Sequence, residues 1–339
     1  LLPPLEPWAQ AAGGAMVLAS LWLMPKGWGV PQASPRKVMA RWIAMGFFSW
    51  LLVLTVLRDA ALLFVDGWAT ETALAVLGLT PVITAVGFLM ARRVARLVDV
   101  RVPVDKLPAS LEGFTIAQIS DVHVGPTIKR EFVQRIVDRV NGMDADLVAI
   151  TGDLVDGSVA QLASHTAPLA DLKSRHGTYV VTGNHEYYSG AQAWIGELER
   201  LGARVLMNEH VMLDHDGGRL AIAGVTDFSA HHFDPSHASD PRRAMKGVPD
   251  GAVKVLLAHQ PRSAPSAAAA GYDLQLSGHT HGGQFWPWNH FVRFSQPFTS
   301  GLHRLGRMWI YISRGTGYWG PPMRFGIPSE ITRIRLVRA

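Results

Sequence analysis

Hydrophobic and polar positions divide the chain at about residue 110. Before this point, long apolar runs follow one another with few charges, and after it short apolar runs alternate with amphipathic segments. The first pattern is typical of membrane helices, and the second is typical of a domain in which strands and helices alternate. The sequence therefore predicts a transmembrane helical region over residues 1–91 and an α/β domain over residues 112–339.

Three apolar runs in the first region have the composition of membrane spans. Residues 38–57 contain one charge, at Arg41, and residues 73–90 contain none. At a rise of about 1.5 Å per residue, each run crosses most of a hydrocarbon core roughly 30 Å thick. Residues 9–24 are also uncharged but shorter, and we expect a third span there. Core helices of a soluble domain and a cleaved signal peptide are the alternatives, and a span upstream of Leu1 stays open.

Positive charge in the connecting segments predicts an orientation. Three basic residues and no acid lie between the first two spans, and a fourth, Arg41, lies near the start of the second, whereas residues 58–72 carry Arg58 against three acids. Residues 92–111, which we expect to be a basic juxtamembrane linker, add further arginines. Because basic loops stay in the cytoplasm, we expect a multi-pass protein with its α/β domain on the cytoplasmic side.

The charge balance and the absence of cysteine narrow the function classes. Arginines that face anionic lipid account for the net charge of +5, so the expected partner is the lipid bilayer. No basic stretch with interleaved aromatic residues lies outside the membrane-proximal region, which disfavours a nucleic-acid partner. The chain has no cysteine, which excludes disulfides, zinc–thiolate sites and a cysteine nucleophile. Metal binding is left to His, Asp, Glu and Asn side chains.

Strands and helices alternate after residue 112. Helices are expected near 130–143, 159–174 and 191–201, with further strands between 204 and 225. The other expected strands cover residues 114–124, 147–156, 178–188, 253–261 and 273–283. This alternation predicts an α/β domain with a buried sheet.

Polar side chains gather where these predicted strands end, and they are Asp121, His123, Asp153, Asp156, Asn184, His185, His259, His279 and His281. In open α/β sheets, ligands bind beyond the carboxyl ends of the strands, so we expect these groups at one edge. The segment SGHTHGGQ (277–284) illustrates the ambiguity of each part taken alone. Its two imidazoles are two residues apart, as on one face of a strand, and they suit either a metal site or a structural turn.

Five motifs together resemble one family. DVH (121–123), GDLVD (152–156), GNHE (183–186), His259 in LLAHQP and GHTH (278–281) occur in the order and approximate spacing of the calcineurin-like metallophosphoesterase superfamily. The resemblance covers roughly residues 112–338. The tail, residues 313–336, is similar to that of the bacterial membrane-associated phosphodiesterase branch. The resemblance implies a layered α/β sandwich and a location at the bacterial inner membrane.

The resemblance also implies a dinuclear metal centre. Asp121, His123 and His281 would hold one divalent ion, Asn184, His259 and His279 the other, and Asp153 would bridge them. A carboxylate supplies the two oxygens that a bridge between two cations needs. His185 is similar to the family's catalytic histidine, which is not a ligand, and Asp156 is expected to support a ligand or a turn. Manganese is the first expectation for both ions, with iron and zinc as alternatives.

The implied reaction is hydrolysis of a phosphodiester or pyrophosphate, in which a hydroxide that bridges the metals attacks phosphorus in line. We expect a lipid-linked substrate, such as a pyrophosphate that resembles UDP-diacylglucosamine. A soluble nucleotide or small phosphoester is one alternative, and a catalytically silent metal-binding sensor is another. His231 and His232 are expected in a loop or at the substrate entrance. The sequence leaves the oligomeric state open.

Overall fold

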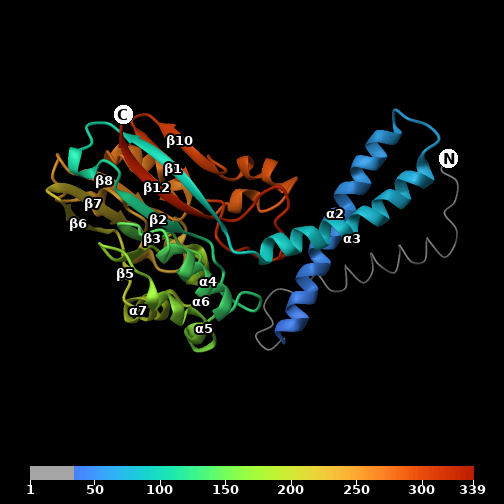
Figure 1. The fold of residues 1–339 in the computed structure, drawn as a ribbon, viewed down its shortest axis with the longest axis horizontal. Helices are drawn as coiled ribbons and strands as arrows, with labels where there is room; N and C mark the ends of the chain where they lie inside the picture. The colour runs from blue at the N-terminus through green and yellow to red at the C-terminus, as the bar shows by residue number, and fades with distance from the viewer. Residues whose placement is uncertain (1–33) are drawn as a thin grey trace. The chain divides into compact units, whose positions relative to one another are not determined.

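A computed structural model describes residues 34–339 of the chain. They form two compact units, shown in Figure 1. The helical unit contains residues 34–93 and 319–326, and the α/β unit contains residues 94–318 and 327–339. The predicted span at 9–24 lies outside the described residues.

The helical unit is built on two long helices, α2 (Pro35–Leu62) and α3 (Ala69–Arg92). By length and composition, both are able to cross a membrane. They contain the predicted runs 38–57 and 73–90, and they leave large apolar side chains such as Val56 and Leu77 exposed. Surfaces of this kind are favourable in lipid and costly in water.

A segment from late in the chain, Trp319–Gly326, completes the helical unit. Met323 lies against Gly46 of α2 and Gly87 of α3, where an added Cβ atom would come within 2.4 Å of the Met323 side chain. The backbone amide of Arg324 donates to the carbonyl of Gly87 at 3.0 Å. The two glycines therefore make room for this segment in the helical unit.

The α/β unit contains two six-stranded sheets. The first has the order β1 (Arg96–Val104), β12 (Glu330–Arg338), β2 (Thr115–Ile119), β3 (Leu147–Ile150), β4 (Thr178–Val180) and β5 (Arg204–Val205). The second has the order β10 (Gly301–Leu305), β11 (Met308–Ile312), β9 (Leu274–Ser277), β8 (Val253–Leu257), β7 (Gly218–Gly224) and β6 (Glu209–His215). Strands β2 to β5 are parallel, and so are β7, β8, β9 and β11.

The two sheets pack face to face through a buried apolar cluster that includes Ile116, Ala149, Ile222 and Leu276. Helices α4 (Arg130–Asn141), α5 (Val159–Thr166), α6 (Asn184–Ser189) and α7 (Ala191–Arg200) lie beside the first sheet in Figure 1. A second cluster joins α8 (Pro241–Met245) and α9 (Ala264–Ala270) to the second sheet. The predicted layered α/β sandwich is confirmed.

The strands are shorter than the sequence predicts. The strand expected over 178–188 ends at Val180, and Asn184 and His185 lie in α6. The other predicted strands also end before their polar residues, because the chain turns out of the sheet first. Apolar periodicity marks where a strand is buried, and it does not mark where the backbone changes direction.

The expected linker over 92–111 differs most from the structure, because its middle is strand β1 at the edge of the first sheet. Val102 and Val104 are buried, and β1 pairs in parallel with β12. Valine alternates with other residues from Val98 to Val104, which is a strand pattern. The arginines in this stretch favoured the interpretation as a basic juxtamembrane linker over the strand that the alternating valines indicate.

Candidate metal centre

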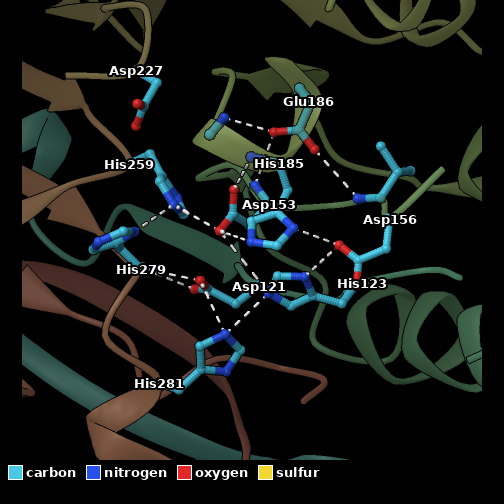
Figure 2. A network of polar contacts seen from close by, with 12 residues as sticks. Asp121, His123, Asp153, Asp156, His185, Glu186, Asp227, His259, His279 and His281 are labelled. Atoms are coloured by element: carbon cyan, nitrogen blue, oxygen red, sulfur yellow. Dashed lines mark hydrogen bonds and ion pairs between the residues drawn. The ribbon is translucent and has the colours of Figure 1, made fainter. Parts of the chain in front are cut away.

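Eight of the nine polar residues singled out above meet at one edge of the α/β unit (Figure 2), and the ninth, Asn184, directly precedes His185 in α6. Asp121, His123, Asp153, Asp156, Asn184 and His185 follow the parallel strands β2, β3 and β4 of the first sheet. His259, His279 and His281 follow β8 and β9 of the second. The cluster therefore draws on both sheets, and it brings together residues up to 160 positions apart, as in the 158-residue separation of His123 and His281.

Left-handed backbone turns aim several of these side chains inward. The φ angles lie between 51° and 71° at Asp121, His123, Asp153, His279 and His281. This region costs a non-glycine residue about 1–3 kcal/mol, and such strain persists where the surrounding structure enforces it, often at functional sites. Five strained residues in one cluster therefore indicate that the position of their side chains has been favoured over backbone stability.

Glycines next to the cluster are required by close approaches. A Cβ atom at Gly183 would lie 2.2 Å from Oδ1 of Asp153, and one at Gly278 would lie 2.2 Å from Oδ2 of Asp121. Both contacts are far inside van der Waals distance. The first residues of GNHE and GHTH are therefore glycines because each carboxylate lies directly against the backbone.

The first group of candidate ligands contains Asp121, His123 and His281, which are all buried. The two imidazole Nε2 atoms are 3.0 Å apart, and Oδ1 of Asp121 is 3.6 Å from Nε2 of His281. The backbone amide of His279 donates to both oxygens of Asp121 at 2.9 and 3.1 Å. These bonds fix the carboxylate beside the two imidazoles.

The second group contains Asp153, His259 and His279. Oδ2 of Asp153 is 3.0 Å from Nε2 of His259 and 4.0 Å from Nε2 of His123, so this carboxylate lies between the two groups. Nε2 of His259 is 3.2 Å from Nδ1 of His279. Oδ1 of Asn184 is buried and has no hydrogen-bond partner among the described residues.

The donor set fits two divalent ions. Two imidazole nitrogens that bind one ion at about 2.1 Å, with bonds about 90° apart, are separated by about 3 Å. The two nitrogen pairs have this spacing, since their separations are 3.0 and 3.2 Å. Two facing nitrogens cannot both carry a proton between them, so each pair directs at least one lone pair inward, and metal binding uses such lone pairs. The unpartnered oxygen of Asn184 is a further acceptor that an ion would satisfy.

Asp156 links the two groups to His185. One of its oxygens accepts from Nδ1 of His123 at 2.9 Å and from Nδ1 of His185 at 2.6 Å. Burial raises the pKa of Asp156, but the two histidines outweigh burial and lower that pKa to about 2. Asp156 is therefore an anion that orients two imidazoles through their Nδ1 atoms. The Nε2 atom of each ring is directed away from Asp156.

The carboxylates also set the charge of the histidines. Burial lowers the pKa of His185, but its bond to Asp156 and the charge of Asp153 outweigh burial and raise that pKa to about 9. Asp153 likewise raises the pKa of buried His259, whereas burial and the nearby His259 lower the pKa of His279 to about 3. The pKa values of the two imidazoles of the second group are therefore shifted in opposite directions, although the rings are in contact.

Glu186 is a residue that the sequence did not point to. It is buried, and its carboxylate accepts from the backbone amides of Asp153, Leu154 and Gly183 at 2.6–2.9 Å. These bonds join the loop after β3 to the loop after β4. The residue lies within GNHE, so the motif contained the signal, but its role depends on a contact between two loops that the sequence does not show.

The remaining expectation has a clear outcome. His231 and His232 lie in the short 3₁₀ helix η4 (Ala230–His232) after β7, and they line a pocket that also reaches Asn184 and His279.

A layered α/β sandwich that gathers two Asp/His groups at one edge is the arrangement of a dinuclear metallohydrolase. The model of the calcineurin-like phosphoesterase family matches residues 114–283 of this chain. The chain belongs to this family, and the resemblance to it is confirmed.

Relatives occur in animals and bacteria. A zebrafish (Danio rerio) protein named transmembrane protein with metallophosphoesterase domain is 38% identical over 290 residues, which cover 83% of this chain and 66% of that protein. A metallophosphoesterase of Helicobacter pylori is 41% identical, with 69% of this chain and 61% of that protein covered. A metallophosphoesterase of Campylobacter jejuni is 32% identical, with 87% and 76% covered. The chain thus spans slightly less than two thirds of the first two relatives.

These relatives bear on two further points. The bacterial ones are consistent with the expected bacterial branch. The zebrafish relative is named a transmembrane protein, and together with α2 and α3 this suggests membrane association.

Replacing Glu186 with Gln should loosen the centre. The amide keeps the size of the carboxylate but accepts backbone hydrogen bonds more weakly, and one of its ends is a donor that would face backbone amides. We expect metal affinity to fall about 10- to 100-fold, measured as the metal content of purified protein after dialysis against a graded chelator. Glu199→Gln, on the exposed face of α7, is the matched control. Equal metal retention in the two variants would remove the role assigned to Glu186.

Proposed function

We propose that the chain is a dinuclear metal-dependent phosphoesterase that hydrolyses phosphodiesters or pyrophosphates. Convergence of two Asp/His groups on the carboxylate of Asp153 is the observation that supports this function most directly. The first ion would be held by Asp121, His123 and His281, the second by Asn184, His259 and His279, and Asp153 would bridge them. Manganese remains our first expectation for both ions, with iron and zinc as alternatives.

Two divalent ions held there would neutralise the charge of a phosphoryl group and activate water for in-line attack. The chain's own residues would supply position and a proton. His185 donates its backbone amide to Oδ1 of Asp153 and shares its Nδ1 proton with Asp156, which fixes the ring. Its side chain is partly exposed, and its Nε2 lies 4.0 Å from Oδ2 of Asp153. This nitrogen is therefore placed to give a proton to an oxygen that leaves the centre.

Replacing His185 with Ala separates catalysis from metal binding. Because His185 is not among the proposed ligands, we expect the variant to keep both ions while turnover of bis(4-nitrophenyl) phosphate falls about 10²- to 10⁴-fold. Metal analysis and steady-state rates, measured on the same preparation, provide the test. His165→Ala on α5 should leave both quantities unchanged. A His185→Ala variant with wild-type turnover would refute the assignment, and loss of one ion would show that His185 is a ligand.

The finer proposal is a substrate that is linked to lipid. Two helices long enough to cross a membrane and a relative that is named a transmembrane protein support it, because such an anchor confines the enzyme to the place where lipid substrates occur. The alternatives are a soluble nucleotide or small phosphoester, with the helices serving as an anchor alone, and a silent metal-binding sensor.

A substrate panel distinguishes these possibilities. We expect full-length protein in lipid nanodiscs with Mn²⁺ to cleave a lipid pyrophosphate at least about 10-fold more efficiently than a soluble nucleotide with the same scissile bond, because the membrane concentrates both partners. The measurement is kcat/KM from released phosphate compounds. Higher efficiency on the soluble compound would favour the second function, and no turnover of either would favour the sensor.

For its location, we propose a multi-pass protein of the bacterial inner membrane with a cytoplasmic α/β unit, which rests on the basic connecting segments. Because the chain has no cysteine, single introduced cysteines report the orientation. In intact spheroplasts, a membrane-impermeant maleimide should label Asp66→Cys, between α2 and α3, and should label Gly251→Cys only after lysis. The opposite pattern would reverse the orientation. Gly251 is a suitable position because no atom lies within 4 Å of an added Cβ.

A further inference from the structure

A pocket of about 330 Å³ opens beside the centre in the α/β unit. Two of its lining residues, Asn184 and His279, are proposed ligands of the second ion, so the pocket reaches that side of the centre. Tyr188 also lines it, and this ring lies edge-on to the ring of His185 at 5.2 Å. The pocket therefore lies beside His185 as well as beside the second group of ligands.

The lining favours an anion. None of the residues that line the pocket is acidic, and Arg262 supplies a positive charge. The Nε and Nη2 groups of Arg262 donate to the carbonyl of Ser295 at 3.1 and 2.7 Å. A guanidinium has five N–H donors, and among the described residues the other three make no hydrogen bond. Arg262 is therefore held in place while three of its N–H groups remain as donors for a phosphoryl group.

The lining also disfavours an acyl chain. Gln296 lines the pocket and is 6% exposed, and its Oε1 atom is buried without a partner among the described residues. A buried acceptor left unpaired costs about 1–3 kcal/mol, and only an occupant or a water with a donor group recovers it. The occupant should therefore be anionic at Arg262, as a phosphorylated sugar or nucleoside is, and a polar occupant suits this lining better than an acyl chain.

The wall of the pocket is already fixed by a buried carboxylate. Asp227 is fully buried and accepts from the backbone amide of Ser229 at 2.8 Å. It also accepts from Nε2 of Gln260 at 3.1 Å. These bonds join the loop of His231 and His232 to the loop of Arg262. A pocket held in this way needs little rearrangement when a ligand binds.

We propose that this pocket binds a second phosphoryl group on the leaving side of the substrate, so that the preferred substrates are pyrophosphates of the form R–O–P–O–P–O–R′. The proposal rests on the proposed function and specifies its substrate class. Hydrolysis forms a bond from water oxygen to one phosphorus and breaks the bond between that phosphorus and the bridging oxygen, which leaves with the other phosphorus. The leaving monophosphate keeps that bond's electron pair, and the protons of water pass to the two products and the solvent. Arg262 stabilises the leaving phosphate.

A matched pair of substrates tests the proposal. Diadenosine 5′,5′-diphosphate and the 5′,5′-diadenosine monophosphate diester have the same end groups and differ by one phosphoryl group. We expect Arg262→Gln to lower the ratio of kcat/KM for the diphosphate to that for the monophosphate about 10- to 100-fold, the range for a lost charge-assisted contact. The assay uses full-length protein with Mn²⁺, and products are separated by chromatography. Arg262→Lys should give an intermediate ratio, because lysine keeps the positive charge but lacks the paired N–H donors of the guanidinium.

The control is Arg293→Gln. Arg293 is a nearby exposed arginine that lies over the ring of Phe294 and does not line the pocket, so its removal should leave the ratio unchanged. Melting temperatures show whether each variant is folded. An unchanged ratio in folded Arg262→Gln would overturn the proposal, and so would an equal fall in the Arg293→Gln control.

Binding of AMP separates this proposal from the proposed function. The Kd of the metal-loaded protein for AMP should rise about 10-fold or more in Arg262→Gln and should stay the same in Arg293→Gln. If the wild type cleaves no phosphoester but binds AMP through Arg262, the proposed function fails and the anion pocket stands. If the wild type is active and neither the ratio nor the AMP affinity depends on Arg262, only the pocket proposal fails. If it is inactive and AMP binding does not depend on Arg262, both fail.

Discussion

The carboxylate of Asp153 is the group on which the rest of the centre depends. It is 3% exposed, it lies between the imidazoles of His123 and His259, and its loop is held by a second buried carboxylate, Glu186. Burying two carboxylates so close together costs several kcal/mol unless positive charge or hydrogen-bond donors compensate. Backbone amides compensate Glu186, and Asp153 receives an amide and imidazoles. A pair of divalent ions would supply the remaining positive charge. The electrostatics of the site and its geometry therefore both favour a dinuclear metal centre.

Much of the fold could be predicted because it is encoded locally. Apolar runs with a period of two or 3.6 mark the strands and helices of the α/β unit and the two long helices. Parallel strands place their carboxyl ends at one edge, so residues that follow different strands, such as Asp121 and His259, were expected to meet. Sequence order and simple strand geometry were sufficient for that step.

The remainder depends on contacts between distant residues or on backbone angles. Whether His123 or His279 adopts a positive φ is decided by the surrounding structure, because neither residue favours it alone. Strand β1 is defined by its pairing with β12, where Asp99 meets Arg333 from 234 positions away. Glu186 is recognisable as a support only when the two loops that it joins are known to be adjacent. Periodicity contains none of this information.

The segment after β11 constrains the centre in a way that no motif indicates. The amides of Thr316 and Gly317 donate to the carbonyls of Ser120 and Asp121 at 2.7 and 3.0 Å. A Cβ atom at Gly317 would lie 2.1 Å from the carbonyl oxygen of Val122. Two residues further on, the chain enters the segment Trp319–Gly326 of the helical unit. The backbone of one candidate ligand, Asp121, is therefore fixed by a segment almost 200 residues further along the chain.

The chemistry of the pocket and that of the long helices bear on different parts of a substrate. A pocket with Arg262 and no acidic lining residue selects a phosphorylated group, and it would do so equally for a soluble nucleotide and for the head group of a lipid. Acyl chains gain little there, because they would leave the remaining N–H donors of Arg262 without an acceptor. A preference for lipid must therefore come from the anchor, which raises the local concentration of membrane-borne substrates without changing the pocket. Selectivity for the phosphoryl groups and selectivity for the membrane are thus separable properties of this chain.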